Sequence, residues 1–173
     1  MKNIFVFCAG DAKARANYRK TILNPVSEDC VFSSISADKH AELRSWHEQA
    51  GGFFAWGFRV NQRTITMLRT LETGDCVLGF FDFHYRVVSR LIGKLENDEL
   101  AEKLWGTPKG ERTWGNIIFI TKPREIAIPA SSLQPYLCSS YRGATRIGSD
   151  RIKCIIRDFG SVDSFVTKSF GVT

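Results

Sequence analysis

Three tryptophans stand where an indole ring could contact a flat ligand. Trp56 is followed by Gly57 and Arg59 at the end of an apolar stretch, and Trp105 and Trp114 flank a Pro-Lys-Gly loop. The face of an indole stacks on a nucleobase, and a neighbouring cation binds the phosphate of the same nucleotide. The combination at Trp56 therefore indicates a nucleobase-binding site.

Asn61 is the polar side chain nearest to this aromatic stretch. Its amide supplies both a donor and an acceptor for the edge of a base. Asn61 also precedes a helical pattern that starts at residue 62, a position where asparagine caps helices well. Both roles stay open, as does a core-packing role for each tryptophan. The candidate base-pocket residues are Trp56, Trp105, Asn61, Phe58, Tyr85 and Trp114.

The charge balance favours a polyanionic partner. Lysine and arginine number 24 against 18 acidic residues, which gives a net charge of +6, and the pI is near 9.2. Such a balance concerns association rather than fold, and each single cation is also compatible with a solvated surface position. The candidate phosphate contacts are Arg59, Arg63, Lys109, Arg112, Arg142 and Arg146, with Arg86 and Arg90 as further possibilities.

Familiar catalytic and metal-binding patterns are missing from the sequence. The pair His47-Glu48 lacks the second histidine of a helical zinc site, and the chain has neither a phosphate-binding glycine loop nor a Gly-x-Ser-x-Gly elbow. Asp75 and Asp82 read as a turn residue and a strand end. We expect a binding module without catalytic activity, metal or cofactor.

The five cysteines have no short spacing, and no apolar stretch is long enough for a signal peptide or a membrane span. The sequence therefore favours a reduced, cytoplasmic protein that does not contact a membrane.

The hydrophobic pattern predicts the elements that must position these residues. Alternating and continuous apolar runs predict strands, and apolar residues at helical spacing predict helices. In the first half we expect a strand over 3–8, helices over 11–22, 36–49 and 62–71, and a strand over 53–60. Ala16 and Ile22 are predicted to face inward. The strands that follow cover 76–83, 85–95, 113–120 and 125–128, with helices over 97–105 and 149–158, the last capped by Ser149.

Strands this closely spaced leave too little room for repeated parallel crossovers. The sequence therefore predicts an α+β fold with a curved, barrel-like sheet flanked by short helices. We expect a single domain over residues 1–173 with its core at about residues 30–150. Residues 150–173 would form a C-terminal helix or a linker toward a further domain.

The order of motifs around Trp56 resembles the EVE branch of the PUA-like superfamily. In EVE domains a tryptophan-containing strand leads to a polar segment with asparagine, a helix, a Gly-Asp turn and the next strand. The segment 141–147 also resembles loops that follow EVE-like domains in modification-dependent restriction proteins. The matching residues in this sequence are Trp56, Gly57, Arg59, Asn61, Gly74 and Asp75, followed by Val77-Leu78 and Ile92-Gly93.

YTH domains give a second resemblance. They carry a first cage tryptophan after a helix, as at Trp56, and a second one before a Lys-Gly loop, as at Trp105. A strand ending like Ile118-Phe119-Ile120 follows. The third aromatic wall of many YTH domains would fall near Pro108, where this chain has no aromatic residue. Trp114, Tyr85 or Phe83 would have to supply that wall.

These resemblances imply a reader that flips a modified base into an aromatic pocket. They point to the recognition domain of a McrBC-type modification-dependent restriction endonuclease, with duplex DNA as partner and N6-methyladenine favoured over 5-methylcytosine. A nuclease or NTPase domain would act in cis or in trans. A YTH-like reader of modified RNA and a small nucleic-acid-processing enzyme are the alternatives.

Overall fold

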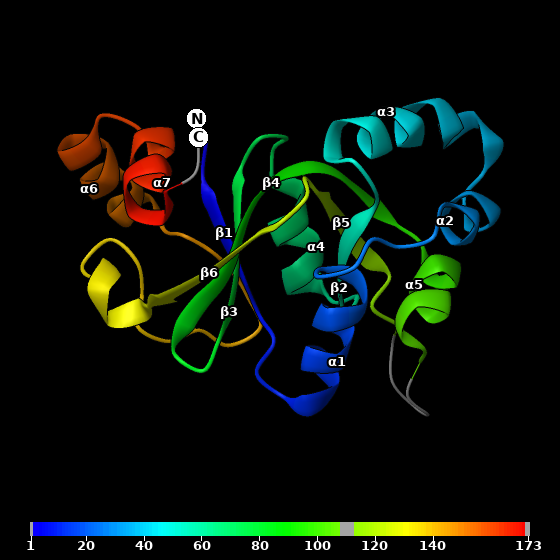
Figure 1. Ribbon diagram of the computed structural model, residues 1–173, viewed down its shortest axis with the longest axis horizontal. Helices are drawn as coiled ribbons and strands as arrows, with labels where there is room; N and C mark the ends of the chain where they lie inside the picture. The colour runs from blue at the N-terminus through cyan, green and yellow to red at the C-terminus, as the bar shows by residue number, and fades with distance from the viewer. Residues whose placement is uncertain (1, 108–112, 172–173) are drawn as a thin grey trace.

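Residues 2–107 and 113–171 are described by a computed structural model, which has one mixed sheet with helices around it (Figure 1). The strands run in the order β2-β5-β4-β3-β1-β7, and β6 also pairs with β4. Among the paired strands, β1 and β3 are parallel and the other pairs are antiparallel. The strands are β1 (Ile4–Cys8), β2 (Phe54–Phe58), β3 (Cys76–Phe81), β4 (His84–Glu96), β5 (Asn116–Ile120), β6 (Arg124–Pro129) and β7 (Ala144–Arg146).

The long strand β4 gives the sheet its curvature. Its first half pairs with β3 on one edge and with β6 on the other, whereas its second half pairs with β5. The register shifts between Leu91 and Gly93, where β5 takes over from β6. Irregularities of this kind bend a strand and increase its twist. One strand thus belongs to two differently oriented parts of the sheet.

The curvature brings the two ends of the sheet toward each other. Phe7 of β1 stacks on Trp56 of β2 with ring centroids 4.6 Å apart, and Phe5 meets Phe58 edge-on at 5.4 Å. The strand order ends at β2 on one side and at β1 and β7 on the other. Aromatic side chains rather than backbone hydrogen bonds therefore join the ends, and we call this junction the seam.

Both faces of β1 are covered, which explains its unbroken apolar sequence. Phe5 and Phe7 lie in one hydrophobic cluster with β2, β5 and the helices α1 to α5. Ile4 and Val6 point the opposite way into a second cluster, with Phe165 among the C-terminal residues. The buried core therefore extends beyond residues 30–150 at both ends of the chain.

Helices flank the sheet on two sides (Figure 1). Helices α6 and α7 lie on one side, helices α2, α3 and α5 lie on the other, and α1 and α4 lie between them. Gly93 allows α3 to approach closely, because a Cβ there would come within 2.2 Å of the Trp46 ring. The helices are α1 (Ala12–Thr21), α2 (Glu28–Ser34), α3 (His40–Ala50), α4 (Gln62–Arg69), α5 (Asp98–Trp105), α6 (Ser149–Phe159) and α7 (Val162–Phe170), with short 3₁₀ turns at Ala37–Lys39 and Ala130–Leu133.

The predicted α+β class with a curved sheet is confirmed, with several local corrections. Helices α2 and α7 and strand β7 were not predicted. Ala16 is exposed rather than inward-facing. Ser149 is the first residue of α6 and not its cap, because Gly148 takes the cap position and no side chain bonds there. Within the described ranges, no helix is long and apolar enough to cross a membrane.

Candidate nucleic-acid interface

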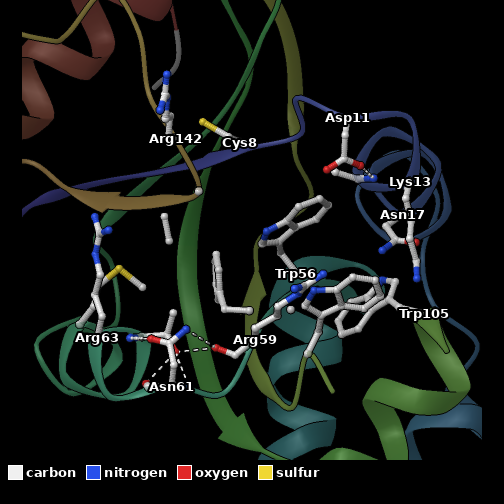
Figure 2. Close-up of a pocket in the computed structure, with 18 residues that line it drawn as sticks. Cys8, Asp11, Lys13, Asn17, Trp56, Arg59, Asn61, Arg63, Trp105 and Arg142 are labelled. Atoms are coloured by element: carbon white, nitrogen blue, oxygen red, sulfur yellow. Dashed lines mark hydrogen bonds between the residues drawn. The ribbon is translucent and has the colours of Figure 1, made fainter. Parts of the chain in front are cut away.

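A cavity of about 410 Å³ opens at the seam between β2 and β7 (Figure 2). Its volume lies within the range of about 300–1,000 Å³ that is usual for small-ligand sites. The end of β1, helix α1, strand β2, helix α4 and the loop before β7 supply its walls. The lining residues are Cys8, Asp11, Lys13, Ala14, Asn17, Trp56, Gly57, Phe58, Arg59, Asn61, Arg63, Thr64, Met67, Trp105, Trp114, Arg142, Gly143 and Ala144.

Trp56 is a core residue and a wall of the cavity at once. Only 7% of its surface is exposed, and its ring stacks on Phe7 with an interplanar angle of 27°. The stack fixes one face of the indole, and the remaining exposed part borders the cavity. Packing in the core and lining a ligand cavity, the two roles that the sequence left open for Trp56, are therefore compatible in the structure.

Trp105 reaches the cavity because its neighbour in β2 has no side chain. A Cβ on Gly57 would lie 2.4 Å from the Trp105 ring and 2.7 Å from the Trp114 carbonyl oxygen. The Trp105 indole Nε1 donates to the Thr21 hydroxyl at 3.3 Å, and Thr21 in turn donates to the Ala55 carbonyl at 2.7 Å. Helices α1 and α5 and strand β2 thus hold the ring in one orientation.

Trp114 and Phe58 complete the aromatic lining. Trp114 is half-buried, and the Lys13 Nζ lies 4.6 Å from its ring centroid. A cation over an aromatic face is attracted by the negative face of the ring. Of the aromatic residues predicted for the pocket, Trp56, Trp105, Trp114 and Phe58 border one cavity.

Asn61 lines the cavity, but its amide is engaged in capping α4. The Asn61 Oδ1 accepts from the Thr64 backbone N–H at 3.0 Å, and the Thr64 hydroxyl accepts from the Asn61 N–H at 3.1 Å. Its Nδ2 donates to the Arg59 carbonyl at 3.3 Å. This reciprocal arrangement is a capping box. The capping role is thus present, and it engages one acceptor site of the Asn61 oxygen and one N–H of its amide.

Helix α1 contributes polar residues that the sequence analysis did not assign to the site. Asp11, Lys13 and Asn17 all border the cavity (Figure 2). Asp11 caps α1 by accepting from the Ala14 N–H at 2.7 Å. Asn17 is half-buried beside Trp105, and its side chain makes no hydrogen bond to another described residue. Lys13 and Asn17 are four residues apart and share a helix face, which is the signal that could have indicated them.

The electrostatics of the cavity favour an anion. Four cationic side chains and one acidic side chain border it among the described residues, namely Lys13, Arg59, Arg63 and Arg142 against Asp11. Figure 2 shows Arg59 beside the two indoles, with Arg63 and Arg142 on the opposite wall. Cations on both walls of an aromatic cavity suit a base with phosphates on either side.

Burial keeps the one thiol of the cavity neutral. Desolvation raises the pKa of Cys8 from its ordinary 9.0 to about 11, and a hydrogen bond involving the Gly143 backbone offsets this only in part. Nucleophilic and metal-binding chemistry requires a thiolate. Cys8 therefore acts as a small apolar surface at neutral pH.

Several predicted residues lie away from the cavity. Tyr85 is fully buried in the other hydrophobic cluster, where its hydroxyl donates to the Cys138 carbonyl at 3.0 Å. Its placement in the pocket was therefore wrong, because the register shift between Tyr85 and Val87 puts Tyr85 with Phe80 and Phe170, whereas Val87 lies in the first cluster. Arg146 lies on the exposed edge strand β7 outside the cavity.

Arg86 and Arg90 also serve other contacts. Arg86 packs over the Phe81 ring with its guanidinium carbon 5.1 Å from the centroid, and Arg90 pairs with Asp163 at 2.8 Å. The remaining predictions, Lys109, Arg112 and the wall near Pro108, lie outside the described residues.

The acidic residues considered for catalysis have structural roles. Asp75 is buried, and its two carboxylate oxygens accept from the backbone N–H groups of Asn3 and Glu72 at 2.7 and 3.0 Å. Asp82 pairs with Arg15 at a hairpin tip. Across 2–107 and 113–171, the structure brings together no group of three histidine, cysteine or acidic residues that could hold a metal ion.

Comparison with solved structures identifies the fold. The chain superposes on the N-terminal domain of Thermococcus gammatolerans McrB, which was solved bound to m5C DNA, with a TM-score of 0.65. The match covers 92% of this chain and 98% of that chain at 14% sequence identity. The expected resemblance to a McrB recognition domain is therefore confirmed at the level of fold.

A second match is weaker. The YTH domain of Zygosaccharomyces rouxii MRB1 protein, in complex with N6-methyladenosine RNA, gives a TM-score of 0.41 at 15% identity, covering 95% of this chain and 91% of that chain. A TM-score this low does not establish a shared fold. No model of a known family and no curated protein sequence matches the chain.

Proposed function

We propose that this chain is a reader of methylated DNA that takes a flipped base into the cavity at the seam. The observation that carries the proposal is one cavity that combines three indole rings with four cations. A base leaving a duplex loses stacking worth a few kcal/mol, and aromatic walls return roughly 1–3 kcal/mol per base. The shared fold with a McrB domain bound to m5C DNA supports the same class of ligand.

The methyl group and the base edge set the choice of base. A buried methyl contributes on the order of 0.8 kcal/mol against apolar walls. The Asn17 amide offers a donor and an acceptor, a pair that suits adenine in known recognition geometries. We therefore place N6-methyladenine before 5-methylcytosine as the ligand.

A binding panel tests the proposal. Matched oligonucleotides, plain or carrying N6-methyladenine, 5-methylcytosine or 5-hydroxymethylcytosine, are titrated as duplex DNA, single-stranded DNA and RNA, with anisotropy as the readout. We expect the tightest binding to one methylated duplex. Equal affinity for plain and modified duplexes would refute a reader function. A preference for modified RNA would show that the ligand is RNA rather than DNA.

Trp105→Ala is the sharpest variant for this panel, and Trp46→Ala is its matched control. Each indole packs against a sheet glycine, Gly57 or Gly93, but Trp46 lies outside the cavity. Both truncations cost stability, on the order of 3–5 kcal/mol for the buried Trp105 and less for the partly buried Trp46. With the folded fraction measured by circular dichroism, Trp105→Ala should lose roughly 1–3 kcal/mol of discrimination and Trp46→Ala none.

We further propose that DNA cleavage and NTP hydrolysis reside on another domain or chain. The cavity supplies base-stacking and phosphate-binding groups, and the one carboxylate among its described lining residues, Asp11, caps a helix. Incubating labelled methylated duplex with the protein and Mg²⁺ should leave the DNA intact. A cleavage activity that co-purifies with the protein would contradict this assignment.

A further inference from the structure

The turn between β3 and β4 holds an aromatic residue in a backbone conformation that suits glycine. The turn has two residues, Asp82 and Phe83, between the paired residues Phe81 and His84. Their φ angles are 51° and 58°. Two-residue hairpins with both φ values positive favour asparagine or aspartate followed by glycine, and a bulky side chain there is strained. Strained positions of this kind cluster at sites of function.

Phe83 gains no packing in return for this strain. Its side chain is 72% exposed, and no other large apolar side chain among the described residues is comparably exposed. Neither hydrophobic cluster includes it. The ring therefore projects from the hairpin tip without a partner in the described part of the fold.

Arg15 connects the hairpin tip to the rim of the cavity. Its guanidinium donates to the Asp82 carboxylate at 2.6 Å and to the Ala9 and Gly10 carbonyl oxygens at 3.3 Å. Arg15 belongs to the first turns of α1, next to Ala14, which borders the cavity. In Figure 1 the hairpin and the start of α1 lie at the same end of the molecule. The hairpin that carries Phe83 is therefore bonded to a helix that borders the cavity.

Two arginines pack on the hairpin that carries Phe83. The guanidinium groups of Arg15 and Arg86 lie over the Phe81 ring, 5.4 and 5.1 Å from its centroid. The carboxylate of Asp82 is paired with Arg15, so the acid beside the exposed ring is neutralised. A single exposed aromatic ring at the tip of this hairpin fits a stacked nucleic acid better than an extended apolar protein surface.

We propose that Phe83 is a wedge that enters the base stack of the duplex beside the extracted nucleotide. The proposal rests on the proposed function, because only base extraction opens a gap in the stack. An apolar ring that fills such a gap replaces part of the lost stacking and keeps the duplex from closing. Phe83 would then act on duplex DNA alone, since a single strand has no gap to fill.

Phe83→Gly separates this role from a structural one. Glycine removes the wedge and also relieves the positive φ, so the variant should fold at least as well as the wild type. We expect its affinity for the preferred methylated duplex to fall roughly tenfold, while its affinity for the same methylated single strand stays within twofold of the wild type. Phe83→Trp, which keeps a large aromatic ring at the tip, should bind the methylated duplex as tightly as the wild type.

The possible results test the wedge role of Phe83 separately from the proposed reading of methylated DNA. If the wild type prefers the methylated duplex and Phe83→Gly keeps its full duplex affinity, the wedge is refuted and the reader stands. Equal losses on duplex and single strand would also refute the wedge, because Phe83 would then be an ordinary contact. If the wild type shows no preference for methylated DNA, both proposals fall.

Discussion

Two asparagines border the cavity, and their hydrogen bonds assign them different roles. Asn61 is occupied by the capping box of α4, whereas the side chain of Asn17 makes no hydrogen bond to another described residue. The Asn61 side chain can read a base only with the donor and the acceptor site that the cap leaves unused. We therefore propose Asn17, rather than Asn61, as the reader of the base edge.

Asn61→Ala should therefore lower stability, whereas Asn17→Ala should lower the discrimination between methylated and plain DNA. Asn61→Ala removes a helix cap and should lower the free energy of unfolding by about 1 kcal/mol, with discrimination between methylated and plain DNA kept. Asn17→Ala should leave stability nearly unchanged and reduce discrimination by about 1–3 kcal/mol. Urea denaturation and anisotropy on both variants measure the two effects, and the reverse pattern would return the reading role to Asn61.

At the scale of elements, helix α4 carries much of one cavity wall and is held at its C-terminal end by the sheet. The Lys94 Nζ, on β4, donates to the carbonyl oxygens of Leu68 and Leu71 at 2.5 and 2.6 Å. These carbonyls belong to the end of a helix, where the last C=O groups lack partners within the helix and a cation is favourable. Lys94 thereby ties the end of α4 to the sheet, in addition to the bond that the Asn116 amide of β5 donates to the Thr64 hydroxyl.

Lys94→Met should loosen this wall while keeping the length of the side chain. We expect a loss of about 1–2 kcal/mol in the free energy of unfolding and weaker binding to plain and methylated DNA alike. The exposed Lys122, whose change to methionine removes the same charge, is the control and should retain full stability. Equal stability of the two variants would show that α4 is held by its apolar contacts alone.

The helices and strands also show how much of the fold could be predicted from the sequence. The strands and helices around Trp56, Asn97 and Ile118 follow strong apolar patterns, and α5 follows Asn97 and ends at Trp105, as predicted. Strand β7 has three residues and exists because β1 offers it an edge, a tertiary cause that leaves little local signal. Helix α7 is rich in β-branched and aromatic residues, which weakens its helical pattern.

The residues of the cavity could be predicted only in part from the sequence, for a related reason. Trp56, Trp105 and Arg59 belong to recognisable motifs, whereas Cys8, Lys13 and Asn17 come from a segment far from these motifs in the chain. The curvature of β4 and the seam bring these segments together, and neither is encoded by local spacing. Tyr85 was misplaced because a strand with two buried faces gives no cue to which face holds the ligand.

At the scale of the whole molecule, the positive charge should control affinity. Log affinity should fall linearly with log salt concentration, because each neutralised phosphate releases counterions. Arg142→Ala should reduce the slope by about one and weaken plain and methylated duplexes alike. Lys153→Ala, which removes an exposed cation on α6 paired with Asp150, should leave the slope unchanged. Affinity that does not vary with salt would refute electrostatic binding.

Buried thiols and phenols should limit the stability of the molecule at alkaline pH. Burial raises the pKa of Cys76 from 9.0 to about 12 and those of Tyr18 and Tyr141 from 10.0 to about 12. In the unfolded chain these groups lose their protons near their ordinary values, whereas the folded chain retains them. The unfolded state then binds fewer protons, so stability falls as pH rises above about 9.

Thermal melts between pH 8 and 11 measure this loss. The midpoint should be flat below pH 9 and decline above it, and Cys76→Ala should show a shallower decline from a lower starting value. A midpoint that stays constant to pH 11 would show that these groups ionise equally easily in both states.

The seam has a consequence for how such a domain could diversify. Within a hydrogen-bonded ladder, a change that shifts register by one residue reverses every side chain of the strand. The cavity walls from α1, α4 and the loop before β7 meet β2 without a ladder between them. Substitutions there can reshape the cavity while every strand keeps its register. The seam is therefore where a lineage of these domains could change its preferred ligand without rebuilding its scaffold.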